Sequence, residues 1–70
     1  MSKPIEQLIQ IVEAGGNVIV GNKSVEQLVA LASASSRSGA EVTIKANKSV
    51  EQLVEIAKAG NGNVTFDLTS

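Results

Sequence analysis

The octapeptide NKSVEQLV occurs twice in this chain, at residues 22–29 and 47–54, and a diverged copy, SKPIEQLI, occupies residues 2–9. The copies start at residues 2, 22 and 47 of a 70-residue chain, so their spacings are 20 and 25 residues. Repetition at this period is typical of proteins built from supersecondary units that pack against their neighbours. The chain is therefore expected to form one domain of three repeats, covering residues 1–21, 22–46 and 47–70.

Each copy opens a pattern typical of an amphipathic helix. Apolar residues recur at positions i, i+3, i+4 and i+7, which places them on one helical face. The stripes are Ile5, Leu8, Ile9 and Val12, then Val25, Leu28, Val29 and Ala32, then Val50, Leu53, Val54 and Ala57. One more apolar residue widens each stripe, at Ile11, Leu31 and Ile56. All of these residues are expected to face the core.

Capping residues bound the predicted helices. Ser24 with Gln27, and Ser49 with Gln52, have the S-x-x-Q spacing of a capping box, and Pro4 holds the aligned position in the first repeat. The middle repeat is lengthened by the letters ASASSRS, which are poor helix material. Three glycines are expected to end the helices in the left-handed conformation, at Gly15, Gly39 and Gly60.

A short strand follows each of these glycines. The segments EVTIKA and NVTFDLT alternate apolar and polar residues, as half-buried strands do, and their alternation aligns Val42 with Val64. The segment NVIVG is apolar on both faces, with Val18 and Val20 on one side and Ile19 on the other.

The order of elements predicts a parallel sheet. Strands joined by helices are parallel, with right-handed crossovers. Strand order 2-1-3 would bury both sheet faces, and the polar letters of the second and third strands disfavour it. We therefore expect an α/β fold, α-β-α-β-α-β, with a three-stranded parallel sheet in order 1-2-3. All helices would cover one face, giving a two-layer, solenoid-like domain.

The third repeat, SVEQLVEIAKAGNGNVTF, resembles tandem α/β repeats of some small bacterial proteins. The layout also resembles that of leucine-rich-repeat proteins, although their L-x-x-L-x-L-x-x-N consensus is missing. The resemblance implies a layout and no activity. Verbatim repetition of eight residues also fits a designed or consensus-built protein, whereas ASASSRS is a segment in which a designer would favour Glu, Lys and Ala.

Composition argues against several functions. The chain has no cysteine and no histidine, so thiolate chemistry, the commonest general base and the commonest metal ligand are missing, and no catalytic function, metal or cofactor is expected. A net charge of -1 and a single aromatic residue argue against nucleic acid as a partner. No specific small molecule is indicated. Short apolar runs and the lack of a secretory signal predict a cytoplasmic or recombinant soluble protein that neither enters a membrane nor is secreted.

One candidate site concerns anions. The segment VIVGNKS approaches the phosphate-loop motif G-x-x-x-x-G-K-[ST], but Asn22 stands before Lys23 where the motif requires glycine. Helix capping is therefore the preferred interpretation. A weaker hypothesis is that Lys23, Ser24, Lys48 and Ser49 bind an anion at the carboxyl ends of parallel strands, beside helix N-termini.

The other candidate site is an interface at Val18, Ile19 and Val20. The first strand is an edge strand, and Ile19 is the apolar residue on an otherwise polar sheet face. The expected partner is a second copy, in a homodimer whose first-strand edges, or faces around Ile19, meet about a two-fold axis. The predicted function is a structural or designed α/β repeat protein without catalysis. The alternatives are a protein-interaction module acting through the open sheet face or edge and, third, weak anion binding.

Removal of the serine caps should destabilise the fold. Ser24→Ala and Ser49→Ala are each expected to cost about 1 kcal/mol, because a helix N–H loses its acceptor, and Pro4→Ala should cost less. Thermal unfolding followed by circular dichroism measures the effect. An unchanged melting temperature in both serine variants would show that the octapeptide is not repeated for capping.

Overall fold

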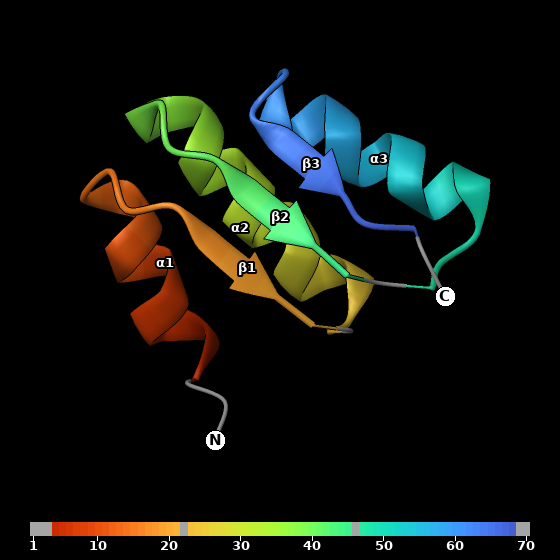
Figure 1. Ribbon diagram of the computed structural model, residues 1–70, viewed down its shortest axis with the longest axis horizontal. Coiled ribbons are helices and arrows are strands. Elements are labelled where there is room, and N and C mark those ends of the chain that lie inside the picture. The colour runs from red at the N-terminus through yellow and green to blue at the C-terminus, as the bar shows by residue number, and fades with distance from the viewer. Residues whose placement is uncertain (1–3, 22, 46, 69–70) are drawn as a thin grey trace.

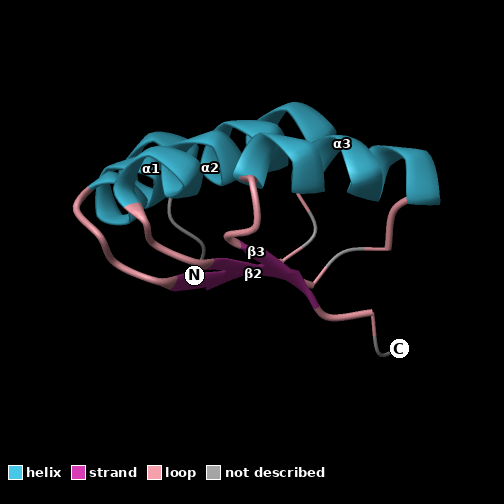
Figure 2. Ribbon diagram, turned by 90° about the horizontal axis from the view of Figure 1, so that it is seen from above, coloured by secondary structure: helices cyan, strands magenta, loops and turns pink. Residues whose placement is uncertain are grey.

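The computed structural model describes residues 4–21, 23–45 and 47–68. Helices and strands alternate: α1 (Ile5–Glu13), β1 (Val18–Val20), α2 (Val25–Ser38), β2 (Val42–Ile44), α3 (Val50–Gly60) and β3 (Val64–Phe66). The strands form a parallel sheet in the order β1-β2-β3 (Figure 1). The three helices form a layer on one face of this sheet, and the other face is uncovered (Figure 2). The predicted fold is confirmed.

The strand register places like residues beside one another. Val42 pairs with Val64, as the sequence predicts, and Val18 pairs with Val42. The neighbouring inner row consists of Val20, Ile44 and Phe66, and the row on the uncovered face consists of Ile19, Thr43 and Thr65. The alternation of apolar and polar letters thus separates a face that packs on the helices from a face that meets solvent.

Helix α2 supplies most of the core. It packs against α1 on one side, α3 on the other and β2 beneath it. Ser35 is the buried polar residue among the described residues, and its hydroxyl donates a hydrogen bond of 2.6 Å to the carbonyl of Ala32. The largest fully buried side chains are Leu28, Leu31, Ile44, Ile56, Val12, Val42 and Ser35.

Serine caps begin α2 and α3 as predicted. The Oγ atoms of Ser24 and Ser49 accept the N–H groups of Gln27 and Gln52, each at 3.3 Å. In α3 the capping box is complete, because Ser49 N–H donates to Gln52 Oε1 at 3.2 Å. In α2 the structure shows only the serine bond, and the side chain of Gln27 is half-buried. Pro4 stands at the N-cap of α1 without a side-chain hydrogen bond.

One of the three predicted helix ends is wrong. Gly15 and Gly39 have the expected positive φ angles, 95° and 83°. Gly60, however, is the last residue of α3, and the left-handed cap is Asn61, with φ 50°. Packing explains the glycine at position 60, because a Cβ there would overlap Cγ2 of Val64 and lie 3.2 Å from its Cβ. Gly60 therefore lets α3 approach β3 closely.

The segment ASASSRS is helical despite its weak propensity. It forms the C-terminal half of α2, which continues to Ser38. Ala32, Ala34 and Ser35 within it are fully buried. Small side chains suit a helix that is packed on three sides, and tertiary packing outweighs the modest differences in intrinsic propensity.

Replacing Gly60 by alanine should lower the free energy of unfolding by about 1 kcal/mol. The methyl group must displace Val64, and such overpacking costs about 1–3 kcal/mol, which outweighs a propensity gain of about 1 kcal/mol. Urea denaturation followed by circular dichroism measures the change. The control is Gly21→Ala, whose Cβ would meet nothing within 4 Å. Its stability should stay within about 0.5 kcal/mol of the parent, and equal stability of the two variants would contradict the close contact.

Candidate functional site

The residues of the predicted anion site lie where α2 and α3 begin. Ser24 and Ser49 are exposed, and their hydroxyl oxygens already accept an N–H group of their own helix. Lys23 and Lys48 precede them and are half-buried. The serine hydroxyl thus occupies one of the N–H groups that an anion would use at a helix N-terminus. Anion binding at these residues stays a prediction.

The carboxylates are spread over the surface. Glu51 and Glu55 stand four residues apart on α3, and both are exposed. Within the described parts of the chain, no group of three or more acidic residues lies close enough to hold a metal ion. None of the described helices combines the length and the apolar character needed to cross a membrane.

Strand β1 presents an apolar side chain on the uncovered sheet face. Ile19 is 71% exposed, whereas Val20 is 5% exposed and Val18 is half-buried against the helical layer. Ile19 shares its row with Thr43 of β2 and Thr65 of β3. Of the three predicted interface residues, Ile19 alone therefore has a side chain exposed on the uncovered face, and the two valines face the helical layer.

The backbone of β1 also has an outward side. Val18 N–H donates to Glu41 C=O at 3.2 Å, and Lys45 N–H donates to Val20 C=O at 2.9 Å. Residues 18 and 20 therefore direct their backbone groups to β2. Because successive residues of a strand alternate in this respect, the N–H and C=O groups of Ile19 point away from the sheet, where another strand can pair with them.

The repeated octapeptide is buried differently in its two positions. In α2, Val25 and Val29 are half-buried, whereas the identical residues of α3, Val50 and Val54, are 75% and 45% exposed. The letters are the same, so the difference comes from the neighbours. Helix α3 lies beside α2, and in this structure α3 has a helix on one side only (Figure 1). We name Val50 and Val54 the outer α3 flank.

The opposite end of the helical layer has a matching exposed residue. Ile11 of α1 is 39% exposed, whereas Leu31 and Ile56, which hold the same repeat position in α2 and α3, are fully buried. Helix α1 stands at the end of the helical layer and has a neighbouring helix on one side only (Figure 1). We name Ile11 the outer α1 flank.

The expectation that every residue of the apolar stripes faces the core is therefore wrong at these positions. Val50, Val54 and Ala57 were expected in the core and are exposed, as is Ile11. A stripe is more deeply buried where its helix has a neighbouring helix on both sides, and α1 and α3 each have a neighbour on one side. The letters of the octapeptide are identical in the second and third repeats, so they carry no signal of this difference in burial.

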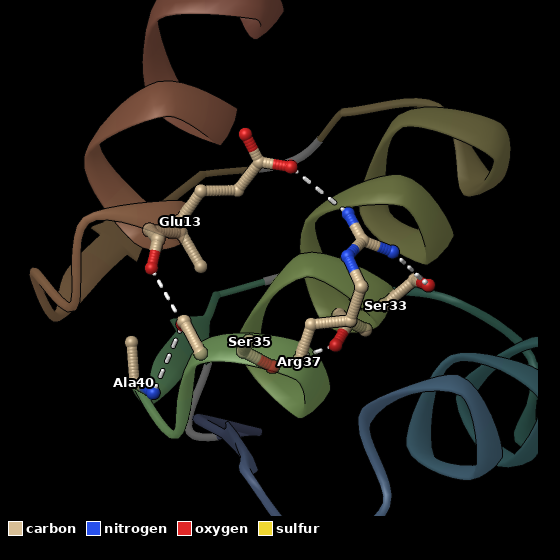
Figure 3. Close-up of polar contacts among 8 residues, drawn as sticks. Glu13, Ser33, Ser35, Arg37 and Ala40 are labelled. Carbon is tan, nitrogen blue, oxygen red and sulfur yellow. Dashed lines mark hydrogen bonds and ion pairs between the residues drawn. The ribbon is translucent and has the colours of Figure 1, made fainter.

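Polar side chains of α2 join it to α1 (Figure 3). Arg37 Nη2 lies 3.0 Å from Glu13 Oε2, and Arg37 Nη1 donates to Ser33 Oγ at 3.1 Å. Ser38 Oγ donates to the carbonyl of Val12 at 2.6 Å. These contacts come from the ASASSRS segment and its end, so the added residues of the middle repeat link it to the first repeat.

Asparagines before β1 and β3 also join repeats. Asn17 Oδ1 accepts the N–H of Glu41 at 2.9 Å, and Asn63 Nδ2 donates to the carbonyl of Ser35 at 3.0 Å. Each asparagine thus bonds the backbone of the neighbouring repeat. These loops are held by the middle repeat and are part of the structural frame.

Comparison of the chain with protein-family models, curated proteins and solved structures found no match. The resemblance to α/β tandem repeats therefore stays a prediction, and the function has to be proposed from the surfaces described above.

Ser38 should matter more for stability than Arg37. Ser38→Ala removes the bond to Val12 and leaves the N–H of the buried residue Ala40 without the Oγ that accepts it at 3.2 Å, a loss of about 1–2 kcal/mol. Arg37→Ala breaks an ion pair whose side chains are 60% and 49% exposed, so it should cost less than about 1 kcal/mol. Parallel urea titrations compare the two variants, and the reverse order would contradict this interpretation.

Proposed function

We propose that this chain is a structural α/β repeat protein, natural or designed in origin, that acts by association and catalyses no reaction. The observation that carries the proposal is the 71% exposure of Ile19 on a sheet face without helices (Figure 2). Its neighbours in the row are threonines, whose methyl groups extend a partly apolar surface. Covering apolar surface is favourable by roughly 25 cal/mol per Å².

The size of the domain supports association. A folded chain of about 60–70 residues buries only about 60% of its unfolded surface. Small scaffolds often gain stability from a disulfide, a metal or a partner, and this chain has no cysteine or histidine with which to build the first two in their usual forms. The partner we propose is a second copy, which meets the first at the β1 edge or at the face around Ile19.

The alternative is a small interaction module that binds another protein through the same surface. Edge strands accept an extended segment of a partner by backbone hydrogen bonds, and side chains beside the edge supply selectivity. The outward backbone of Ile19 favours this mode, because it lies beside the exposed isoleucine side chain.

Substitution of Ile19 tests the proposal. Ile19→Lys should lower the apparent mass in solution, measured by size-exclusion chromatography with light scattering, and leave the helical circular dichroism signal intact, because Ile19 lies outside the core. The control is Ser36→Lys, which adds the same charge at an exposed site of α2. A parent chain that is monomeric at about 1 mM has no self-association of functional strength, and that result would contradict the proposal of a second copy.

A further inference from the structure

The outer α3 flank and the outer α1 flank match the two surfaces that form the interface between α2 and α3. α2 and α3 pack side by side. A Cβ at Gly60 of α3 would lie 3.5 Å from the Cβ of Ala32, so the side of α2 that carries Ala32 faces α3. At 100° per residue, Val25 and Val29 share that side of α2, and Ile56, four residues before Gly60, lies on the side of α3 that faces α2. Their burial agrees, since the valines are half-buried and Ile56 is fully buried.

Both halves of this interface recur, uncovered, at opposite ends of the molecule. The outer α3 flank, Val50 and Val54, has the same letters as the α2 side of the internal interface. The outer α1 flank, Ile11, holds the repeat position of Ile56. Inside the chain, the valine side of α2 packs against the isoleucine side of α3. The equivalent valines are exposed on the outer α3 flank, and an isoleucine at the same repeat position is exposed on the outer α1 flank.

The geometry points to a second copy of this chain docked head to tail, with its α1 and β1 placed against the α3 and β3 of the first copy. The contact extends the helical layer and the sheet in the direction that the repeats already follow. The inference rests on the proposed association and names the surfaces that meet. It is an open, heterologous contact, so a third copy can bind in the same way.

The strand edges fit the same arrangement. Val42 N–H donates to Asn63 C=O at 3.0 Å and Asp67 N–H donates to Ile44 C=O at 2.9 Å, so residues 63 and 67 direct these groups to β2. By alternation, Val64 and Phe66 turn their backbone groups to the outer edge of β3. The backbone N–H and C=O groups on the outer edge of β3 therefore belong to Val64 and Phe66, and those on the outer edge of β1 belong to Ile19.

The internal register extends to the second copy without a change. Within the chain, Val18 of β1 pairs with Val42 of β2, and Val42 pairs in the same way with Val64 of β3. Continuing that register sets Val64 of one copy beside Val18 of the next, and Thr65 beside Ile19. Valines then meet under the helical layer, and Ile19 gains a neighbour along the sheet row, as in the internal pairs.

A two-fold contact at β1 accounts for fewer of the exposed residues. A two-fold axis normal to the sheet would bring two β1 strands together antiparallel and place the two α1 helices side by side. The outer α3 flank, with Val50 at 75% exposure, would stay uncovered in both copies. The head-to-tail contact covers both outer flanks and both strand edges at once.

Complementation between two variants tests the contact. Ile11→Lys blocks the α1 end and leaves the α3 end intact, whereas Val54→Lys blocks the α3 end and leaves the α1 end intact. Each variant alone should be monomeric by light scattering, at concentrations where the parent chain forms species larger than a dimer. An equimolar mixture should form a dimer and stop there, because each copy supplies one working end. Ser36→Lys, on the middle helix, should behave as the parent does.

The outcomes separate this inference from the proposed function. A Val54→Lys variant that keeps the mass of the parent, or a mixture that stays monomeric, would overturn the head-to-tail contact while association through β1 survives. A parent chain that is monomeric throughout would overturn both. Should either lysine variant lose helical circular dichroism signal, Ile11→Gln and Val54→Gln give the same test without a charge, and a monomer–dimer difference of two-fold in mass is the expected readout.

Discussion

The packing of α2 against two helices and the sheet at once is the constraint on which the rest of this structure depends. A chain of 70 residues has little material for a core, and α2 is the one described helix covered on three sides. Leu28 and Leu31 on it are fully buried, as are Ile56 of α3 and Val12 of α1. The end helices are therefore stabilised mainly through α2, which lies between α1 and α3 (Figure 1).

Close approach of these elements requires small residues at particular points. Gly60 lies where a Cβ would overlap Val64 and stand 3.5 Å from the Cβ of Ala32. Ser35 occupies the same repeat position in α2, where its hydroxyl is satisfied by the carbonyl of Ala32. Small residues at these points let the helices approach closely, and the packing they permit outweighs their lower helix propensity.

The two ends of the helical layer expose apolar residues that are more deeply buried at the equivalent positions of the centre. A solenoid repeat buries its apolar surface against the next repeat, and terminal repeats normally replace that surface by polar residues. Here the third repeat keeps Val50 and Val54, and the first keeps Ile11 and the edge strand with Ile19. The exposed valine and isoleucine residues at both ends, which hold the repeat positions of the internal contacts, are the observations from which association is proposed.

The sequence by itself determined the elements, their order and the register between β2 and β3. Helical periodicity, serine caps and period-two alternation are local signals, and they sufficed for Ser24 and Ser49 as caps, for the pairing of Val42 with Val64 and for Ile19 on the open face. Only the tertiary structure decided how deeply each repeat is buried and why Gly60 is a glycine. Identical octapeptides have identical local preferences, so nothing in their letters separates Val25 from Val50. The burial of a side chain depends on the elements packed against it. The position of a helix within the layer therefore decides which of its faces is covered by a neighbouring helix.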